Sequence, residues 1–101
     1  MQKEGKLQKK ILDYLNSKPY IWSTKIIIAN KAGVPDIIGV CKGKFFAIEV
    51  KDKLGVVSAL QKYVHTLIRK ADGNLLIAYD LETVKQFIGD LDDTNSINAD
   101  R

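Results

Sequence analysis

Within the first sixteen residues, hydrophobic positions recur every three or four residues, which is the spacing of one face of an α-helix. This stripe consists of Leu7, Ile11, Leu12 and Leu15. Residues 17–19 (Ser-Lys-Pro) end the pattern, so the sequence predicts an amphipathic helix over residues 3–16. Glu4 lies on the same stripe, and two interpretations of it stay open: a carboxylate that projects toward the buried side, or the acid that favours a helix N-terminus.

The next three segments have the composition of β-strands. Residues 20–28 are rich in aromatic and β-branched side chains, and residues 37–41 and 45–51 form two further apolar runs. The last two runs are separated by Lys42-Gly43, where glycine supplies the positive φ that a tight turn needs. The sequence therefore predicts a strand followed by a β-hairpin.

Two more helices are predicted after the hairpin, with a strand between them. Ser58-x-x-Gln61 has the form of a capping box, and the helix that it begins ends near Gly73. The predicted buried stripe of this helix is Leu60, Val64, Leu67 and Ile68. Residues 75–79 have the pattern of a strand, and Asp80 is placed to cap the last helix. The inward-facing side chains of that helix are Val84, Phe87, Ile88 and Leu91.

This order of elements predicts an α/β fold in which a mixed central β-sheet is flanked by helices. At 101 residues the chain is one domain, which we expect to span residues 1–91, with residues 92–101 as a flexible polar C-terminal tail. A domain of this size lies near the small end of what buries a core by itself, so a partner subunit would help.

Composition excludes several classes of protein. The sequence holds no apolar run of about 18 residues, and no hydrophobic signal segment follows the first residues, so we expect an intracellular, cytoplasmic protein with no membrane partner. Cys41 is the single cysteine, which excludes an internal disulfide and a thiolate zinc cluster. A small buried side chain in a strand is the favoured interpretation of Cys41.

The net charge of +4 is unevenly distributed: +5 over residues 1–31, +3 over 32–79 and −4 over 80–101. A basic body with an acidic tail suits a polyanion such as nucleic acid, although lysines also keep small domains soluble. The lysines that could contact phosphates are Lys3, Lys6, Lys9, Lys10, Lys25, Lys31, Lys42, Lys44 and Lys53.

The hairpin carries the candidate chemistry. With Lys42-Gly43 as the loop, Asp36 faces Glu49 across the two strands, and directly opposed residues have Cβ atoms about 4.5–5.5 Å apart. Lys51 shares their face of the sheet. Because both faces of the hairpin are apolar, two ionised acids there need compensation. A magnesium ion would provide it, since it favours oxygen ligands.

Lys51 is placed to orient or deprotonate an attacking water and to balance charge on the transition state. A plain salt bridge between Lys51 and one of the acids stays an alternative, and a one-residue slip of register would put the acids on opposite faces.

The residues of the hairpin also resemble a known signature. Gly33-Val34-Pro35-Asp36 followed by Ile48-Glu49-Val50-Lys51 resembles the PD-(D/E)XK nuclease motif. With a glutamate in the first helix (Glu4) and Ser58-x-x-Gln61, the order resembles the virus-type replication-repair nuclease (VRR-NUC) branch over about residues 4–79.

The resemblance implies a restriction-endonuclease-like αβββαβα core and a Mg²⁺- or Mn²⁺-dependent endonuclease acting on DNA. It implies catalytic roles for Asp36, Glu49, Lys51 and Gln61. The implied metal ligands are Asp36, Glu49, the backbone carbonyl of Val50 and, through the metal's water shell, Glu4. Small members of the branch resemble Holliday-junction resolvases, so the resemblance also implies a homodimer that cuts branched DNA.

The sequence alone leaves other functions, and other roles for single residues, open. The chain could be a restriction-like or non-specific nicking endonuclease, or a non-catalytic DNA-binding module with the same fold. Gln61 serves the capping box, the site, or both. For His65, four residues later, a solvated helix edge is favoured over a contact with DNA. Tyr20 and Trp22 either stack on unpaired bases or belong to a core or interface.

Overall fold

The computed structural model describes residues 3–99 and contains four strands and three helices in the order αβββαβα. The elements are α1 (Lys3–Asn16), β1 (Ile21–Lys25), β2 (Ile37–Cys41), β3 (Lys44–Val50), α2 (Ala59–Lys70), β4 (Asn74–Ala78) and α3 (Leu81–Ala99). This confirms the predicted order. No helix among the described residues is both long enough and apolar enough to span a bilayer.

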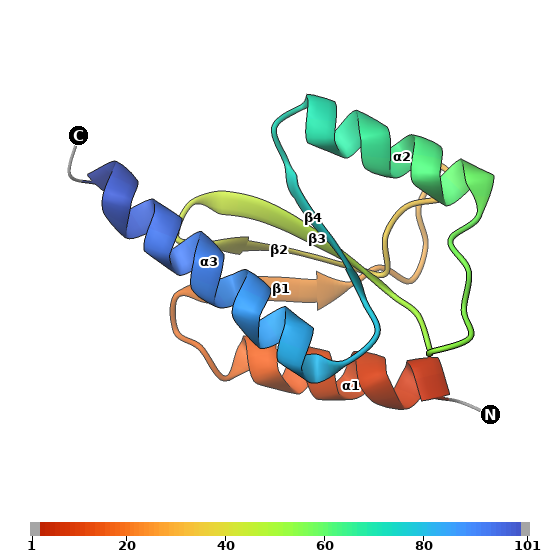
Figure 1. Cartoon of the computed structure of the whole chain (residues 1–101), viewed down its shortest axis with the longest axis horizontal. Helices are drawn as coiled ribbons and strands as arrows, with labels where there is room; N and C mark the ends of the chain where they lie inside the picture. Colours follow the sequence, from red (N-terminus) through yellow and green to blue (C-terminus); the bar gives the residue numbers. More distant parts are fainter. Residues whose placement is uncertain (1–2, 100–101) are drawn as a thin grey trace.

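The four strands form one mixed sheet in the order β1-β2-β3-β4 (Figure 1). β2 is antiparallel to both β1 and β3, whereas β4 runs parallel to β3 after the crossover through α2. Helices α1 and α3 lie together against one face of the sheet, and α2 lies on the other side. The fold is therefore a three-layer α/β arrangement with a sheet between helices, as the sequence predicted.

The hydrophobic core lies between the sheet and the α1–α3 pair. Its fully buried members are Ile11 and Leu15 from α1, Ile37, Cys41, Phe46, Ile48, Val50 and Ala78 from the strands, and Val84 and Ile88 from α3. Burial raises the pKa of the Cys41 thiol, so this side chain acts as a small core residue. The core-facing side chains of α1, of α3 and of the hairpin are thus the predicted ones.

The hairpin has the predicted register. Ile37 pairs with Ile48 and Cys41 with Lys44, so the loop consists of Lys42 and Gly43. Both loop residues have positive φ, 50° and 85°, which is the two-residue turn whose twist matches that of the strands. This register places the backbone of Asp36, just before β2, opposite Glu49 near the end of β3.

The predicted length of the first strand is wrong. Strand β1 ends at Lys25, so the predicted strand 20–28 is too long, and Ile27 and Ile28 are exposed. The amide of Ile26 still donates to the carbonyl of Asp36 at 2.8 Å.

Helix α3 continues past Leu91, where its apolar pattern ends, to Ala99. A packed helix propagates at little cost once nucleated, and the Asp92 carboxylate forms an ion pair with Lys42 in the hairpin turn. The polar tail predicted for residues 92–101 is therefore helical as far as Ala99. Residues 100–101 lie outside the described part.

Helix α2 is rotated relative to its predicted stripe. Leu60 and Leu67 are 48% and 45% exposed, whereas His65 is 1% exposed and fully packed. The helix also covers only part of the sheet, because Val40 and Phe45 near the hairpin turn are 40% and 41% exposed. The expectation that both hairpin faces are apolar and buried thus holds only for the end that carries Asp36 and Glu49.

Candidate active site

The two acids of the hairpin are held together by the sheet. Asp36 accepts a 2.8 Å hydrogen bond at Oδ2 from the backbone amide of Val50, the residue after Glu49. Glu49 itself is only 2% exposed, on the α2 side of the sheet. Asp36 is fixed in turn by the preceding Pro35, whose restricted φ stiffens the chain as it enters β2. Both carboxylates are thus positioned by backbone geometry on one face of the sheet.

Three side chains surround the Glu49 carboxylate. Gln61 donates from Nε2 to Oε2 of Glu49 at 3.0 Å, and the Lys51 ammonium lies 3.9 Å from the same oxygen. Nε2 of His65 lies 3.6 Å from Oε1. Lys51 comes from β3, whereas Gln61 and His65 come from successive turns of α2. The buried acid is therefore enclosed by one cation and two polar groups.

Gln61 belongs to the capping box of α2 and also contacts Glu49. Its Oε1 accepts from the backbone amide of Ser58 at 2.9 Å, while the Ser58 hydroxyl accepts from the amide of Gln61 at 3.1 Å. This is a complete capping box at the start of α2. The remaining amide nitrogen is left to reach Glu49, so the cap of the helix and the site share one residue.

The electrostatics of the pair are unfavourable without a cation. Burial, and then the charge of Asp36 and its hydrogen bond, raise the pKa of Glu49 from its ordinary 4.5 to about 8. Lys51 opposes this rise, and Glu4 adds to it. Two acids in a dry site cannot both ionise unless positive charge is supplied. The site therefore lacks one positive charge for both acids to be ionised at neutral pH.

Glu4 lies in the first turn of α1 and is half-buried. The charge of Glu4 contributes to the raised pKa of Glu49. Among the described residues, no hydrogen bond joins Glu4 to Glu49. They also contain no group of three or more His, Cys, Asp or Glu side chains arranged to hold a metal ion.

Two carboxylates are nevertheless a sufficient protein set for magnesium, which keeps several waters and takes further oxygens from a phosphate. Oε1 of Glu49 is buried and has no hydrogen-bond partner among the described residues. An unpartnered carboxylate oxygen beside a second carboxylate is a chemical fit for a divalent cation. The carboxylates of Asp36 and Glu49 are thus chemically suited to a divalent cation.

His65 was missed by sequence reasoning, which favoured a solvated helix edge. The spacing in the sequence could have revealed it. Residues four apart lie on one face of a helix, so His65 shares a face with Gln61, for which the family resemblance implies a role in the site. His65 lies against Glu49, and burial together with the charges of Arg69 and Lys51 lowers its pKa. Trp22, in contrast, is 62% exposed and lies on the edge strand β1, away from the acids.

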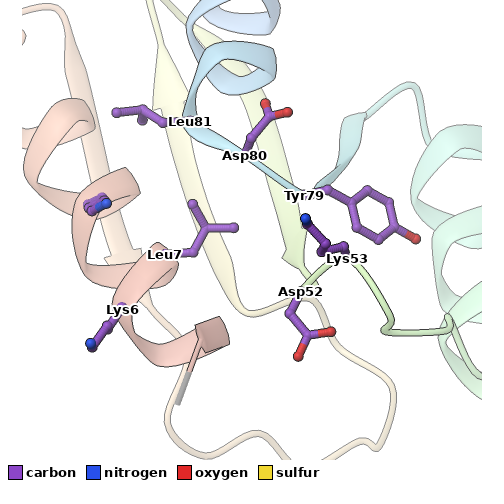
Figure 2. Close-up of a pocket in the computed structure, with 8 residues that line it drawn as sticks. Lys6, Leu7, Asp52, Lys53, Tyr79, Asp80 and Leu81 are labelled. Carbon is purple, nitrogen blue, oxygen red and sulfur yellow. The ribbon is translucent and has the colours of Figure 1, made fainter. Parts of the chain in front are cut away.

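A cavity of about 380 Å³ lies at the end of the sheet where β3 and β4 finish (Figure 2). Leu7 of α1 borders it, and Asp52 and Tyr79 border it from the segments that follow the two strands. The complete lining is Lys6, Leu7, Lys10, Asp52, Lys53, Tyr79, Asp80 and Leu81. The cavity adjoins Lys51 along the chain but does not include the paired acids.

No family model matches the sequence, and no curated protein matches it. Among solved structures, the chain is similar to one described as a VRR_NUC domain, with a TM-score of 0.76 and 23% sequence identity. The match covers 88% of this chain and 97% of that one. At this level of identity the comparison speaks to the fold, and it agrees with the family resemblance seen in the motifs. The chain has the fold of a VRR_NUC domain.

Proposed function

We propose that this protein is a Mg²⁺- or Mn²⁺-dependent endodeoxyribonuclease that hydrolyses phosphodiester bonds. The observation that carries the proposal is the pairing of the partly buried Asp36 with the buried Glu49, beside the ammonium of Lys51. Burial, and then the charge of Asp36, raise the pKa of Glu49 to about 8. Nothing in the packing of the sheet requires two acids there. Their mutual repulsion is a cost that a cation-binding role explains.

Asp36 and Glu49, with the carbonyl of Val50, would hold the cation, and Glu4 would contact its water shell. A divalent cation there would neutralise charge developing on the phosphate and promote deprotonation of the attacking water. Lys51 has a separate role: its Nζ donates a hydrogen bond to the attacking water or to a non-bridging phosphate oxygen. Gln61 keeps the Glu49 carboxylate in place through its 3.0 Å hydrogen bond.

The cavity of Figure 2 supports a nucleic-acid substrate. Lys6, Lys10 and Lys53 line it, and within the described residues none of them forms an ion pair. Its two acids have other partners: Asp52 accepts from the amide of Leu54, and Asp80 caps α3. The three ammonium groups are thus available to DNA phosphates next to the site.

The direct test is incubation of the pure protein with labelled DNA and Mn²⁺. We expect cleavage by the wild type, and loss of cleavage with DNA affinity retained in Asp36→Asn, because only the cation site is altered. Lys9→Ala is the matched control, since Lys9 is paired with Asp13 on the exposed side of α1. Absence of cleavage of every DNA tested, in the presence of working control nucleases, would contradict the proposal.

We also propose branched DNA such as a four-way junction as the substrate, and a homodimer as the active form. The family resemblance supports both. An exposed apolar stripe on α2, formed by Leu60, Tyr63 and Leu67, supports the dimer, because isolated domains rarely leave such a stripe uncovered. A panel of linear, nicked, flapped and four-way DNAs tests the substrate. Sedimentation of wild type and Leu67→Lys tests the dimer, and a wild-type monomer would contradict it.

A further inference from the structure

His65 is the single histidine of the chain and is among its most buried polar side chains. Its Nε2 faces Oε1 of Glu49 at 3.6 Å, and both of these atoms are buried without a hydrogen-bond partner in the described residues. Buried polar atoms are nearly always paired, so two unpartnered atoms that face each other call for an explanation.

Two side chains of α2 approach the Glu49 carboxylate. Gln61 and His65 lie four residues apart on α2 and therefore project from the same face of the helix. Gln61 approaches Oε2 of Glu49, and His65 approaches Oε1. Helix α2 thus presents one nitrogen to each oxygen of the Glu49 carboxylate.

The position of α2 is itself fixed close to this site. Gly33 lies in the loop before Asp36, and a Cβ placed on it would lie 3.0 Å from Leu60 Cγ and from Val64 Cγ2. This contact joins the loop that supplies Asp36 to the helix that supplies Gln61 and His65. The distance between the helix and the paired acids is therefore set by close packing.

We propose that His65 is a positioning residue, which donates from Nε2 to Oε1 of Glu49 and, with Gln61, holds that carboxylate in the orientation that binds the divalent cation. The inference rests on the proposed function. A carboxylate that binds a cation is ionised, and hydrogen bonds to ionised oxygens shorten to about 2.7–2.9 Å. A movement of less than about 1 Å would bring the two atoms from 3.6 Å to that distance.

Hydrogen bonds to metal-binding carboxylates contribute to affinity, and loss of such a partner costs about 10- to 100-fold. The test compares His65→Met with His65→Gln. The two substitutes have similar length, but only glutamine keeps an N–H donor at the position of Nε2. We expect the affinity for Mn²⁺, measured by calorimetry without DNA, to fall at least tenfold in His65→Met and to be restored to within about threefold in His65→Gln.

Thr66→Ala is the matched control, because Thr66 is exposed on the next position of α2. Its Mn²⁺ affinity should equal that of the wild type. Equal affinities of His65→Met and the wild type would overturn the inference, as would an equal loss in His65→Met and His65→Gln.

A second measurement uses the unmutated protein and covers the case in which His65→Met does not fold. Because the chain has one histidine, its imidazole ¹⁵N resonances need no assignment by mutation. Titration with Mg²⁺ should shift the Nε2 resonance with the same half-saturation as a calorimetric titration with Mg²⁺. An unchanged resonance at saturating Mg²⁺ would overturn the inference.

The outcomes separate the two proposals. A protein whose Mn²⁺ affinity falls in His65→Met and is restored in His65→Gln, but which cuts no DNA, keeps the positioning role and loses the nuclease. A protein that cuts DNA with unchanged Mn²⁺ affinity in His65→Met keeps the nuclease and loses the positioning role.

Discussion

Gln61 joins the cap of α2 to the buried acid Glu49: its Nε2 donates to Oε2 of Glu49 at 3.0 Å while its Oε1 accepts from the Ser58 amide at 2.9 Å. The stability of the helix start and the orientation of the carboxylate therefore depend on the same side chain. The two effects are separable, because Ser58 contributes to the cap without touching Glu49.

Ser58→Ala and Gln61→Ala should each lower the free energy of unfolding by about 1 kcal/mol, since each removes part of the capping box. Mn²⁺ affinity should fall in Gln61→Ala alone. Urea denaturation and calorimetry measure the two quantities. A loss of Mn²⁺ affinity in Ser58→Ala as large as that in Gln61→Ala would show that the cap, and not the hydrogen bond to Glu49, is responsible.

The stability of the metal-free protein should fall as pH rises from about 6.5 to about 8. Over this range an unfolded glutamate with a pKa of 4.5 is ionised, whereas Glu49, with its pKa raised to about 8, keeps its proton. The native state binds more protons, so the free energy of unfolding decreases with pH, by about 1 kcal/mol per unit.

Below pH 6.5 the lowered pKa of His65 acts in the opposite direction, because the unfolded histidine takes up a proton that the native one does not. Urea denaturation in EDTA across pH 5 to 9 measures the free energy of unfolding both below and above pH 6.5. Glu49→Gln should remove the decrease above pH 6.5. A wild-type stability that stays constant between pH 6.5 and 8 would disagree with the buried acid described here.

Lys6→Ala combined with Lys10→Ala should weaken DNA binding without abolishing cleavage, because both lysines line the cavity beside the site. Each lost phosphate contact reduces the slope of log affinity against log salt by about 0.9, so the double variant should lose nearly two units. Fluorescence anisotropy in EDTA measures the slope without cleavage. Lys9→Ala is the control. Identical slopes in the double variant and in Lys9→Ala would show that DNA does not contact the cavity.

Gly33→Ala should destabilise the protein more than Gly43→Ala does. Both glycines have nearly the same positive φ, 84° and 85°, so both variants carry the left-handed backbone penalty of about 1–2 kcal/mol. A Cβ at Gly43 meets nothing within 4 Å, whereas one at Gly33 presses on Leu60 and Val64. The difference in unfolding free energy, about 1–3 kcal/mol, measures the contact between α2 and the Asp36 loop. Equal losses would mean that this contact is not tight.

Much of the site could be predicted because it depends on local rules. A two-residue turn at Lys42-Gly43 fixes the hairpin register, and the register alone places Asp36 opposite Glu49. The capping box marks the start of α2 in the same way. Short-range geometry of this kind is readable from residue types and spacing.

The place of His65 beside Glu49 could not be predicted, since it depends on how α2 is rotated over the sheet. A count of hydrophobic residues places Leu60 and Leu67 inward, but the end of the sheet beneath the helix carries Glu49 and Lys51. The helix therefore turns Gln61 and His65 toward the sheet and leaves both leucines exposed. Which partner a helix face meets is a tertiary property, and polar partners override the hydrophobic stripe.

Anomalous diffraction from crystals of the protein grown with Mn²⁺ tests most directly whether the paired acids are a cation site. We expect a manganese peak within coordination distance of the Asp36 and Glu49 carboxylates and of the Val50 carbonyl. A site that remains free of manganese at concentrations that support cleavage, or a peak bound to other side chains alone, would contradict this account.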